Sequence, residues 1–206
     1  MTVECPGHPR RYSRSIGRAP RLVPAVLCAL ALAFLQRAVA QESASPLEYQ
    51  VKAAFLFNFA KFVEWPSDNP RDAEDGFVIC VFEDESLAQA LDQAVSGKTV
   101  EGRVFRVRRL QNLDDTRSCR MLYLGGSDTS RLVALLKSVR TTAVLTVGNA
   151  PGFTRQGGII NFIMQDNRVR FEINPEAADR AGLRISSKLL QLATIVRDAA
   201  NLEHER

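Results

Sequence analysis

The sequence predicts an α/β protein: a three-layer sandwich, with a mostly parallel central sheet covered by helices on both faces and an antiparallel hairpin late in the chain. Two observations carry this prediction. Short, continuously apolar segments alternate with amphipathic helical segments, a pattern typical of strands buried on both faces. Near the C-terminus, two segments of strand length flank the turn-forming residues Gln165, Asp166 and Asn167, which indicates a hairpin.

The first predicted helix begins after Ser45. Ser45 can cap the helix, Pro46 suits its first position, and Glu48 completes a capping box. Apolar residues at spacings of three and four then form one expected core face: Leu47, Val51, Phe55, Phe59 and Phe62. Trp65 and Pro66 end the helix and begin a loop.

The remaining elements alternate along the chain. Strands are predicted at Phe77–Phe82, Val104–Leu110, Met121–Leu124, Val144–Val147, Ile159–Met164 and Arg168–Ile173. Helices are predicted at Leu87–Val95, at Ser130–Val139 and from Ser186 to about Leu202, the last with Leu189, Leu192, Val196 and Ala199 on one face. The glycine-rich segment Gly148–Gly158 is either a binding edge or an ordinary connection.

Residues 1–40 show the three zones of a cleavable secretory signal. A basic zone precedes an apolar run of about 14 residues, Leu22–Leu35, which is shorter than the roughly 20 residues needed to span a bilayer. Ala38–Ala40 then supplies the small residues that a signal peptidase requires. We therefore expect cleavage after Ala40 and a single mature domain, 41–206; the alternative is an anchor kept after export.

Cleavage of this signal would change the charge of the chain. The full sequence has 27 Lys and Arg against 23 Asp and Glu. Residues 1–40 hold six of these bases and one of these acids, which leaves 21 against 22, a net charge of −1. Binding to nucleic acid requires a surplus of Lys and Arg, so the mature domain is not expected to bind it.

Two of the four cysteines, Cys80 and Cys119, lie after the signal. An even pair in an oxidising compartment indicates a disulfide, which would place their strands close together, most simply as neighbours. Closing this loop of about 40 residues would contribute on the order of 4 kcal/mol through chain entropy. The alternative is two buried free thiols. With no histidine nearby, two cysteines are too few for a zinc site.

The mature domain lacks the usual signatures of an enzyme. Its single histidine, His204, is third from the C-terminus, where a scaffold cannot hold it for a catalytic triad. The acidic cluster Glu83–Glu85 follows a predicted strand. We interpret it as a solvated turn rather than a calcium site, because the spaced ligands of a calcium loop are missing. We predict no catalytic residue, no metal and no cofactor; an enzyme working through a carboxylate pair is the least supported alternative.

A binding surface is the remaining functional feature of the sequence. Alternation places Glu172 on the polar face of its strand, and Asn174 follows at the strand end. Arg180, Arg184 and Lys188 lie around the expected start of the last helix, where basic groups are unfavourable for the helix dipole. Arg184 and Lys188 are therefore candidates to hold an anion or an acidic partner residue. The alternative is an ion pair with Glu172 or with Glu176.

Long segments of the chain resemble the YfiR family of periplasmic proteins. The resemblance begins with YQVKAAFLFNFAKFVEWP and continues in order through six further segments: Gly97–Val100, Cys119, Leu145–Val147, Gly157–Phe162, Val169–Asn174 and Leu183–Leu190. It implies a non-enzymatic periplasmic regulator that holds a membrane-bound diguanylate cyclase inactive by binding its periplasmic part. It also implies redox control through disulfides and a capacity to form homodimers. Cys80 and Cys119 match a disulfide pair of the family.

The resemblance therefore favours a periplasmic repressor of cyclic-di-GMP signalling and of biofilm formation. Its expected partner is the periplasmic domain of an inner-membrane diguanylate cyclase or sensor kinase. The expected contact residues are Trp65, Glu172, Asn174, Arg180 and Arg184, since Trp and Arg are common interface hot spots. The alternative is a periplasmic small-ligand-binding accessory protein, serving a sensor kinase or an outer-membrane uptake system, with a pocket near Trp65 and Arg184.

Overall fold

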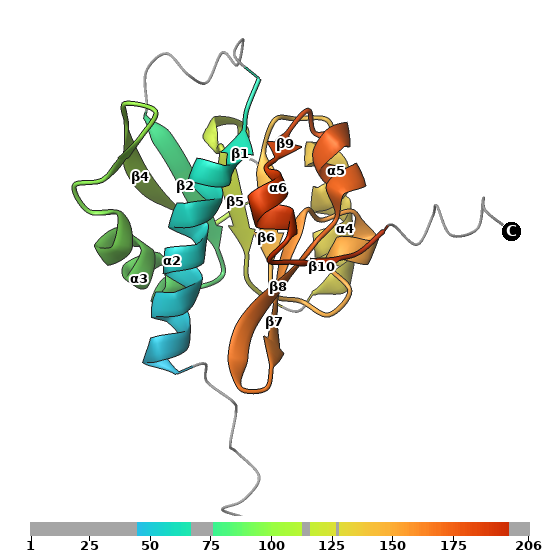
Figure 1. Ribbon diagram of the computed structural model, residues 1–206, viewed down its shortest axis with the longest axis horizontal. Helices are drawn as coiled ribbons and strands as arrows, with labels where there is room; N and C mark the ends of the chain where they lie inside the picture. The colour runs from blue at the N-terminus through green and yellow to red at the C-terminus, as the bar shows by residue number, and fades with distance from the viewer. Residues whose placement is uncertain (1–44, 67–75, 113–115, 127, 198–206) are drawn as a thin grey trace, which may run out of the picture. The chain divides into compact units, whose positions relative to one another are not determined.

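The computed structural model describes residues 45–66, 76–112, 116–126 and 128–197 (Figure 1). The helical elements are α2 (Pro46–Phe62), α3 (Glu85–Val95), η2 (Thr116–Ser118), α4 (Thr129–Val139), η3 (Thr154–Gln156), α5 (Pro175–Arg180) and α6 (Ser187–Leu190). The strands are β1 (Val63–Glu64), β2 (Phe77–Phe82), β3 (Thr99–Val100), β4 (Arg103–Leu110), β5 (Met121–Leu124), β6 (Leu145–Gly148), β7 (Ile160–Gln165), β8 (Arg168–Ile173), β9 (Arg184–Ile185) and β10 (Thr194–Ile195). The proposed signal at residues 1–40 and His204 lie outside the described residues.

The central sheet has the strand order β10-β8-β7-β6-β5-β2-β4-β3. All neighbours are parallel except β7 with β8 and β3 with β4. One apolar cluster joins the sheet to α2, α3, α5 and α6, and a second joins the opposite face to α4. Figure 1 shows α2 and α6 in front of the sheet. The predicted fold class is therefore confirmed.

The start of α2 follows the capping prediction only in part. The Ser45 hydroxyl accepts a hydrogen bond from the Glu48 amide at 3.2 Å, and Pro46 is the first helical residue. The Glu48 carboxylate instead pairs with the Lys52 ammonium at 2.6 Å, one helical turn further on. Lys52 is only 4% exposed, so this ion pair lies on the buried face of the helix rather than at its cap.

The buried face of α2 differs from the predicted apolar stripe. Leu47 is 68% exposed and Phe62 is 37% exposed, although both belong to that stripe. The buried residues are Lys52, Ala53, Leu56, Phe59 and Ala60. The small side chains of Ala53 and Ala60 allow α2 to pack closely against its neighbours, and this packing outweighs the preference to bury every large apolar residue.

The hairpin of β7 and β8 confirms the predicted turn. Asp166 and Asn167 connect the strands with φ values of 50° and 57°, and Gln165 pairs with Arg168. A two-residue turn with positive φ at both positions matches the right-handed twist of the flanking strands, and Asn and Asp tolerate this conformation better than most residues.

The predicted closing helix from Ser186 to about Leu202 is wrong within the described residues. Helix α6 ends at Leu190, and Leu192, assigned to its apolar face, is 70% exposed. The chain then forms β10, which pairs in parallel with β8. Thr194, Ile195 and Val196 are β-branched and favour a strand, and β8 offers them an open edge.

The disulfide joins Cys80 in β2 to Cys119, two residues before the start of β5. Their Cα atoms are 5.7 Å apart, both residues are fully buried, and β2 and β5 are paired neighbours in the sheet. The predicted bridge is confirmed, and with it the expectation that its two segments lie side by side. Among the described residues, no helix combines the length and the apolar composition needed to cross a membrane.

Candidate functional site

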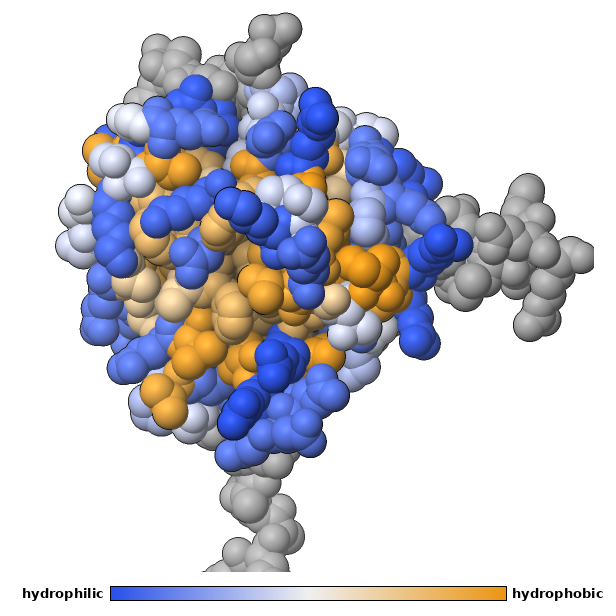
Figure 2. All heavy atoms as spheres, in the orientation of Figure 1, coloured by the Kyte–Doolittle hydropathy of each residue, from blue (hydrophilic) through white to orange (hydrophobic). Residues whose placement is uncertain are grey.

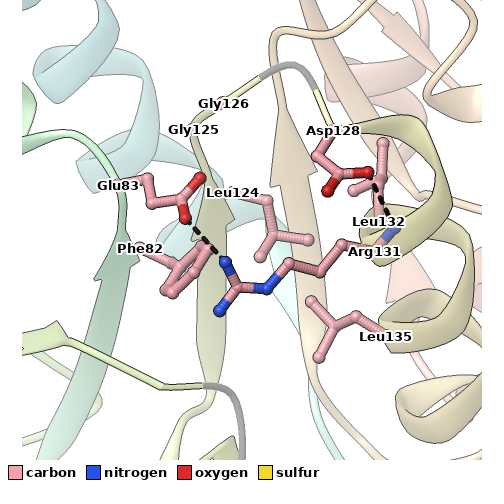
Figure 3. Close-up of a pocket in the computed structure, with 9 residues that line it drawn as sticks. All are labelled: Phe82, Glu83, Leu124, Gly125, Gly126, Asp128, Arg131, Leu132 and Leu135. Atoms are coloured by element: carbon pink, nitrogen blue, oxygen red, sulfur yellow. Dashed lines mark hydrogen bonds and ion pairs between the residues drawn. The ribbon is translucent and has the colours of Figure 1, made fainter.

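A pocket opens at the carboxyl ends of β2 and β5 (Figure 3). The chain leaves β2 through α3 toward one face of the sheet and leaves β5 through α4 toward the other. Because the two connections diverge, they leave a crevice between neighbouring parallel strands, the usual ligand site of open α/β sheets. The crevice has a cavity volume of about 20 Å³ and is lined by Phe82, Glu83, Leu124, Gly125, Gly126, Asp128, Arg131, Leu132 and Leu135.

The floor of the crevice is apolar. Phe82 ends β2, Leu124 ends β5, and both are nearly fully buried. Leu132 and Leu135 reach the crevice from the first turns of α4 (Figure 3). An apolar floor with a few charged groups at its rim is the usual composition of a small-molecule site.

The rim carries an ion pair between Glu83 and Arg131. The Arg131 Nη1 donates to the Glu83 Oε1 at 3.0 Å, across 48 residues of sequence. The Arg131 guanidinium carbon also lies 4.8 Å from the centre of the Phe82 ring, a cation–π contact. Both charged side chains are about half exposed, and an ion pair in this setting contributes little to stability.

The amino end of α4 is capped by Asp128. Its Oδ1 accepts hydrogen bonds from the amides of Ser130 and Arg131 at 3.1 and 3.2 Å, and from the Ser130 hydroxyl at 2.7 Å. These donors hold the pKa of Asp128 below its ordinary value, so the carboxylate stays ionised at neutral pH. The Asp128 carboxylate therefore already accepts hydrogen bonds from amides at the start of this helix.

Two glycines bring the β5 loop against the end of β2. A Cβ at Gly125 would lie 2.7 Å from the Glu83 carbonyl oxygen, and a Cβ at Gly126 would collide with the Glu83 carboxylate. Glu83 itself has a φ of 56°, a left-handed conformation that few non-glycine residues adopt. Sequence reasoning missed this crevice; its available signal was the Gly125–Gly126 pair directly after an apolar strand.

The three acids of the Glu83–Glu85 cluster have separate roles. Glu83 lines the crevice, while the Asp84 Oδ1 accepts a hydrogen bond from the Leu87 amide at 3.0 Å and caps α3. The Glu85 carboxylate pairs with Arg109 at 2.9 Å. Within the part of the chain that the structure describes, no group of three or more His, Cys, Asp or Glu residues is arranged to hold a metal ion.

Asp84 also belongs to a partly buried polar group between α2 and the sheet. Burial raises the pKa of Asp84 above its ordinary value, and the Leu87 amide and the Lys52 ammonium offset part of this effect. Burial likewise raises the pKa of the Tyr123 hydroxyl, and the negative charge of Asp84 adds to this shift. Tyr123 is fully buried on β5, so this group ties α2 and α3 to the centre of the sheet.

The structure separates the five contact residues expected from the sequence. Trp65 follows β1, Arg180 lies in the last turn of α5, and Arg184 lies in β9, which pairs with β1 and contacts α5. These three residues therefore gather near the two-stranded β1–β9 sheet. Glu172 and Asn174 belong to a different group, formed around the buried Thr154.

Asn174 is fully buried and is not part of an exposed surface. Its side chain accepts a hydrogen bond from the Ala177 amide at 3.0 Å, capping α5, and donates to the Thr154 carbonyl at 2.9 Å. The Glu172 carboxylate accepts a hydrogen bond from the Thr154 hydroxyl at 3.1 Å. Asn174 and Thr154 thus link η3 to the start of α5 beneath the partly exposed Glu172.

Arg184 does not lie at the start of a long helix, contrary to the sequence expectation. It faces Glu64 across the β1–β9 pair, with the Arg184 Nε 4.0 Å from the Glu64 Oε2. The side chains are 86% and 74% exposed. Glu176 is one of the two pairing partners considered for Arg184. Its Oε1 instead lies 3.9 Å from the Arg197 Nε.

Comparisons with known proteins place the chain in a family. A solved structure, described as a conserved domain protein from Vibrio cholerae O1 biovar El Tor strain N16961, is 12% identical, with a TM-score of 0.47. The match covers 71% of this chain and 59% of that protein, so this chain spans about three fifths of its length. No curated protein shows a significant match. The sequence profile described as YfiR/HmsC-like matches residues 49–194, well over half of the sequence, and this chain therefore belongs to the YfiR/HmsC-like family.

Proposed function

We propose that this chain is a periplasmic repressor that binds the periplasmic domain of an inner-membrane diguanylate cyclase and holds down cyclic-di-GMP synthesis. The supporting observation is the family match over residues 49–194. The YfiR/HmsC-like family is periplasmic, is regulatory rather than catalytic, and acts with membrane signalling proteins. Repression requires the chain to bind one conformational state of its partner more tightly than another.

The proposed contact surface is the β1–β9 surface, formed by Phe62, Glu64, Trp65 and Arg184. Phe62, Glu64 and Arg184 are exposed, and Trp65 is half-buried beside them. The Arg184–Glu64 pair is long and solvated, so a partner can replace it at little cost. Figure 2 shows apolar areas interrupted by charged side chains on the α2 face of the molecule, a mixture suited to a reversible protein interface.

The disulfide supports a redox-sensitive form of this proposal. Arg120 directly follows Cys119, and its carbonyl oxygen accepts the indole hydrogen bond of Trp65 at 3.3 Å. Reducing the bridge to Cys80 would release the segment that positions Trp65 and would thereby weaken the β1–β9 surface. The single pair would then couple the redox state of the periplasm to partner binding.

Two experiments test repression and its surface. Deletion of the gene is expected to raise cyclic-di-GMP and biofilm formation; unchanged levels in a strain with an intact partner cyclase would refute repression. In co-purification with membranes of the same host, Arg184→Glu is expected to reduce capture of the partner about thirtyfold, as for a hot-spot arginine. The matched control is Arg106→Glu, an exposed arginine on β4, which should bind as wild type. Equal loss in both variants would argue against the β1–β9 surface.

The export signal and the oligomeric state belong to the same proposal. We propose that residues 1–40 are removed and that the working protein is the domain 41–206, alone or as a homodimer. Mass spectrometry of protein recovered from the periplasm should find Gln41 at the mature N-terminus. An intact residue 1 in that fraction would contradict cleavage.

The second candidate function, a small-ligand-binding accessory protein for a sensor kinase or an uptake system, is favoured by the crevice between β2 and β5. Neither Trp65 nor Arg184, near which the sequence predicted a pocket, lines this crevice. The gene next door separates the two functions: a membrane cyclase or kinase gene favours repression, and a lone uptake receptor gene favours ligand delivery.

A further inference from the structure

The crevice between β2 and β5 has the position of a phosphate site but not its chemistry. Open α/β sheets usually hold phosphate at this position on free amides that open a helix. Here Asp128 already occupies the amides at the start of α4. The Glu83 carboxylate lies directly over Gly126. An incoming phosphate would therefore meet two carboxylates, which repel it.

The Arg131 side chain supplies a positive charge at the rim of the crevice. Its guanidinium lies over the Phe82 ring and donates to Glu83, so one positive group uses both the aromatic face and the carboxylate (Figure 3). The side chain is 47% exposed and sits at the rim. Such a contact is weak, and the long arginine side chain can move into solvent without disturbing the sheet.

We propose that the crevice binds a small organic cation, an amine or guanidinium with a short apolar body, in place of the Arg131 guanidinium. The cationic group pairs with the Glu83 carboxylate and lies on the face of Phe82. The apolar body packs on Leu124, Leu132 and Leu135. With Arg131 displaced, Glu83 and Asp128 leave the crevice with two negative groups, which favours a cation over a neutral or anionic ligand.

This binding is independent of the proposed repression, because it needs no partner protein. The probes are isoamylamine and agmatine, followed by amide NMR shifts of Leu124, Gly125 and Gly126 and by calorimetry. Wild-type protein is expected to bind both amines saturably. Arg131→Ala removes the internal competitor and is expected to bind them about fivefold more tightly. Glu83→Gln removes the carboxylate and is expected to bind at least about tenfold more weakly.

Two controls make the result specific to the crevice. Arg109→Ala removes another half-exposed arginine, held by Glu85 and Asp92 on α3. It should bind the amines as wild type does. Isoamyl alcohol, the uncharged isostere of isoamylamine, should not bind. Circular dichroism and thermal melting of every variant establish that it is folded, and Glu83→Asp, which keeps the charge, should retain more affinity than Glu83→Gln.

Three outcomes would overturn the proposal. The first is no saturable amine binding by either wild type or Arg131→Ala. The second is equal binding of isoamyl alcohol, which would show that the crevice recognises only apolar bulk. The third is tighter binding of adenosine monophosphate than of either amine, which would show that the crevice accepts phosphate despite Glu83 and Asp128.

Discussion

The indole N–H of Trp65 donates to the carbonyl oxygen of Arg120 at 3.3 Å, across 55 residues of sequence. Arg120 follows Cys119, so this bond joins the residue after β1 to the residue beside the disulfide. The Trp65 ring also packs edge-on against the Phe77 ring, with 5.1 Å between the ring centroids. Trp65 is thus fixed by the same segment that the Cys80–Cys119 bridge holds against β2.

Trp65→Phe tests this anchoring. Phenylalanine keeps an aromatic contact with Phe77 but cannot donate to the Arg120 carbonyl. We expect the variant to lose about 1 kcal/mol of unfolding free energy, the typical net value of one hydrogen bond. Urea denaturation at neutral pH measures it. Phe62→Leu, at an exposed neighbouring position, is the control and should change stability by less than about 0.5 kcal/mol; an equal loss in both variants would contradict the anchoring.

Cys80→Ser tests the contribution of the disulfide. Opening a bridge with a sequence separation of 39 residues is expected to cost about 2–4 kcal/mol and to leave a free thiol at Cys119. Denaturation and thiol labelling under denaturing conditions measure these two effects. Two reactive thiols in wild-type protein recovered from the periplasm would contradict a formed bridge.

Asp84→Asn is expected to make stability less dependent on pH. Burial raises the pKa of Asp84 in the folded protein, so the folded state binds this proton more tightly than the unfolded chain does. The resulting stability is present below the unfolded pKa and is lost as pH rises through the folded pKa. Asparagine caps a helix as well as aspartate does, so the bond to the Leu87 amide can remain.

The measurement is the melting temperature of Asp84→Asn minus that of wild type, followed from about pH 4 to about pH 7. We expect this difference to rise with pH, because only wild type must hold a partly buried carboxylate at neutral pH. A difference that stays constant or falls as pH rises would show that Asp84 does not titrate with a raised pKa.

Leu189→Ala and Leu192→Ala test the corrected end of the chain. Leu189 is 3% exposed in α6, whereas Leu192 is 70% exposed beyond it. We expect Leu189→Ala to cost about 2–4 kcal/mol through the cavity it leaves. Leu192→Ala should stay within about 0.5 kcal/mol of wild type. Similar losses from both variants in urea denaturation would instead support one long helix that buries both residues.

Elements whose signals are contiguous in sequence were predicted well. Strands β2 and β5 have the predicted bounds, because unbroken apolar runs leave little choice of register. The interpretation failed where a short segment finds its partner far along the chain. Val63 pairs with Ile185, and Thr194 pairs with Glu172, and neither pairing has a local signal. The helix α5 was also missed, although Asn174 and Pro175 are a recognisable cap and first residue.

The sequence by itself determined the fold class, the hairpin turn at Asp166 and Asn167, and the family, because caps, turns and apolar periodicity act over a few neighbouring residues. Only the tertiary structure decided which side chains meet. It placed Glu83 against Arg131 at the crevice and Arg184 against Glu64 at the β1–β9 surface, and it buried Asn174. These contacts depend on the strand order and on the faces of the sheet that α3 and α4 cover. Each contact joins residues that are too far apart in sequence for a local pattern to predict it.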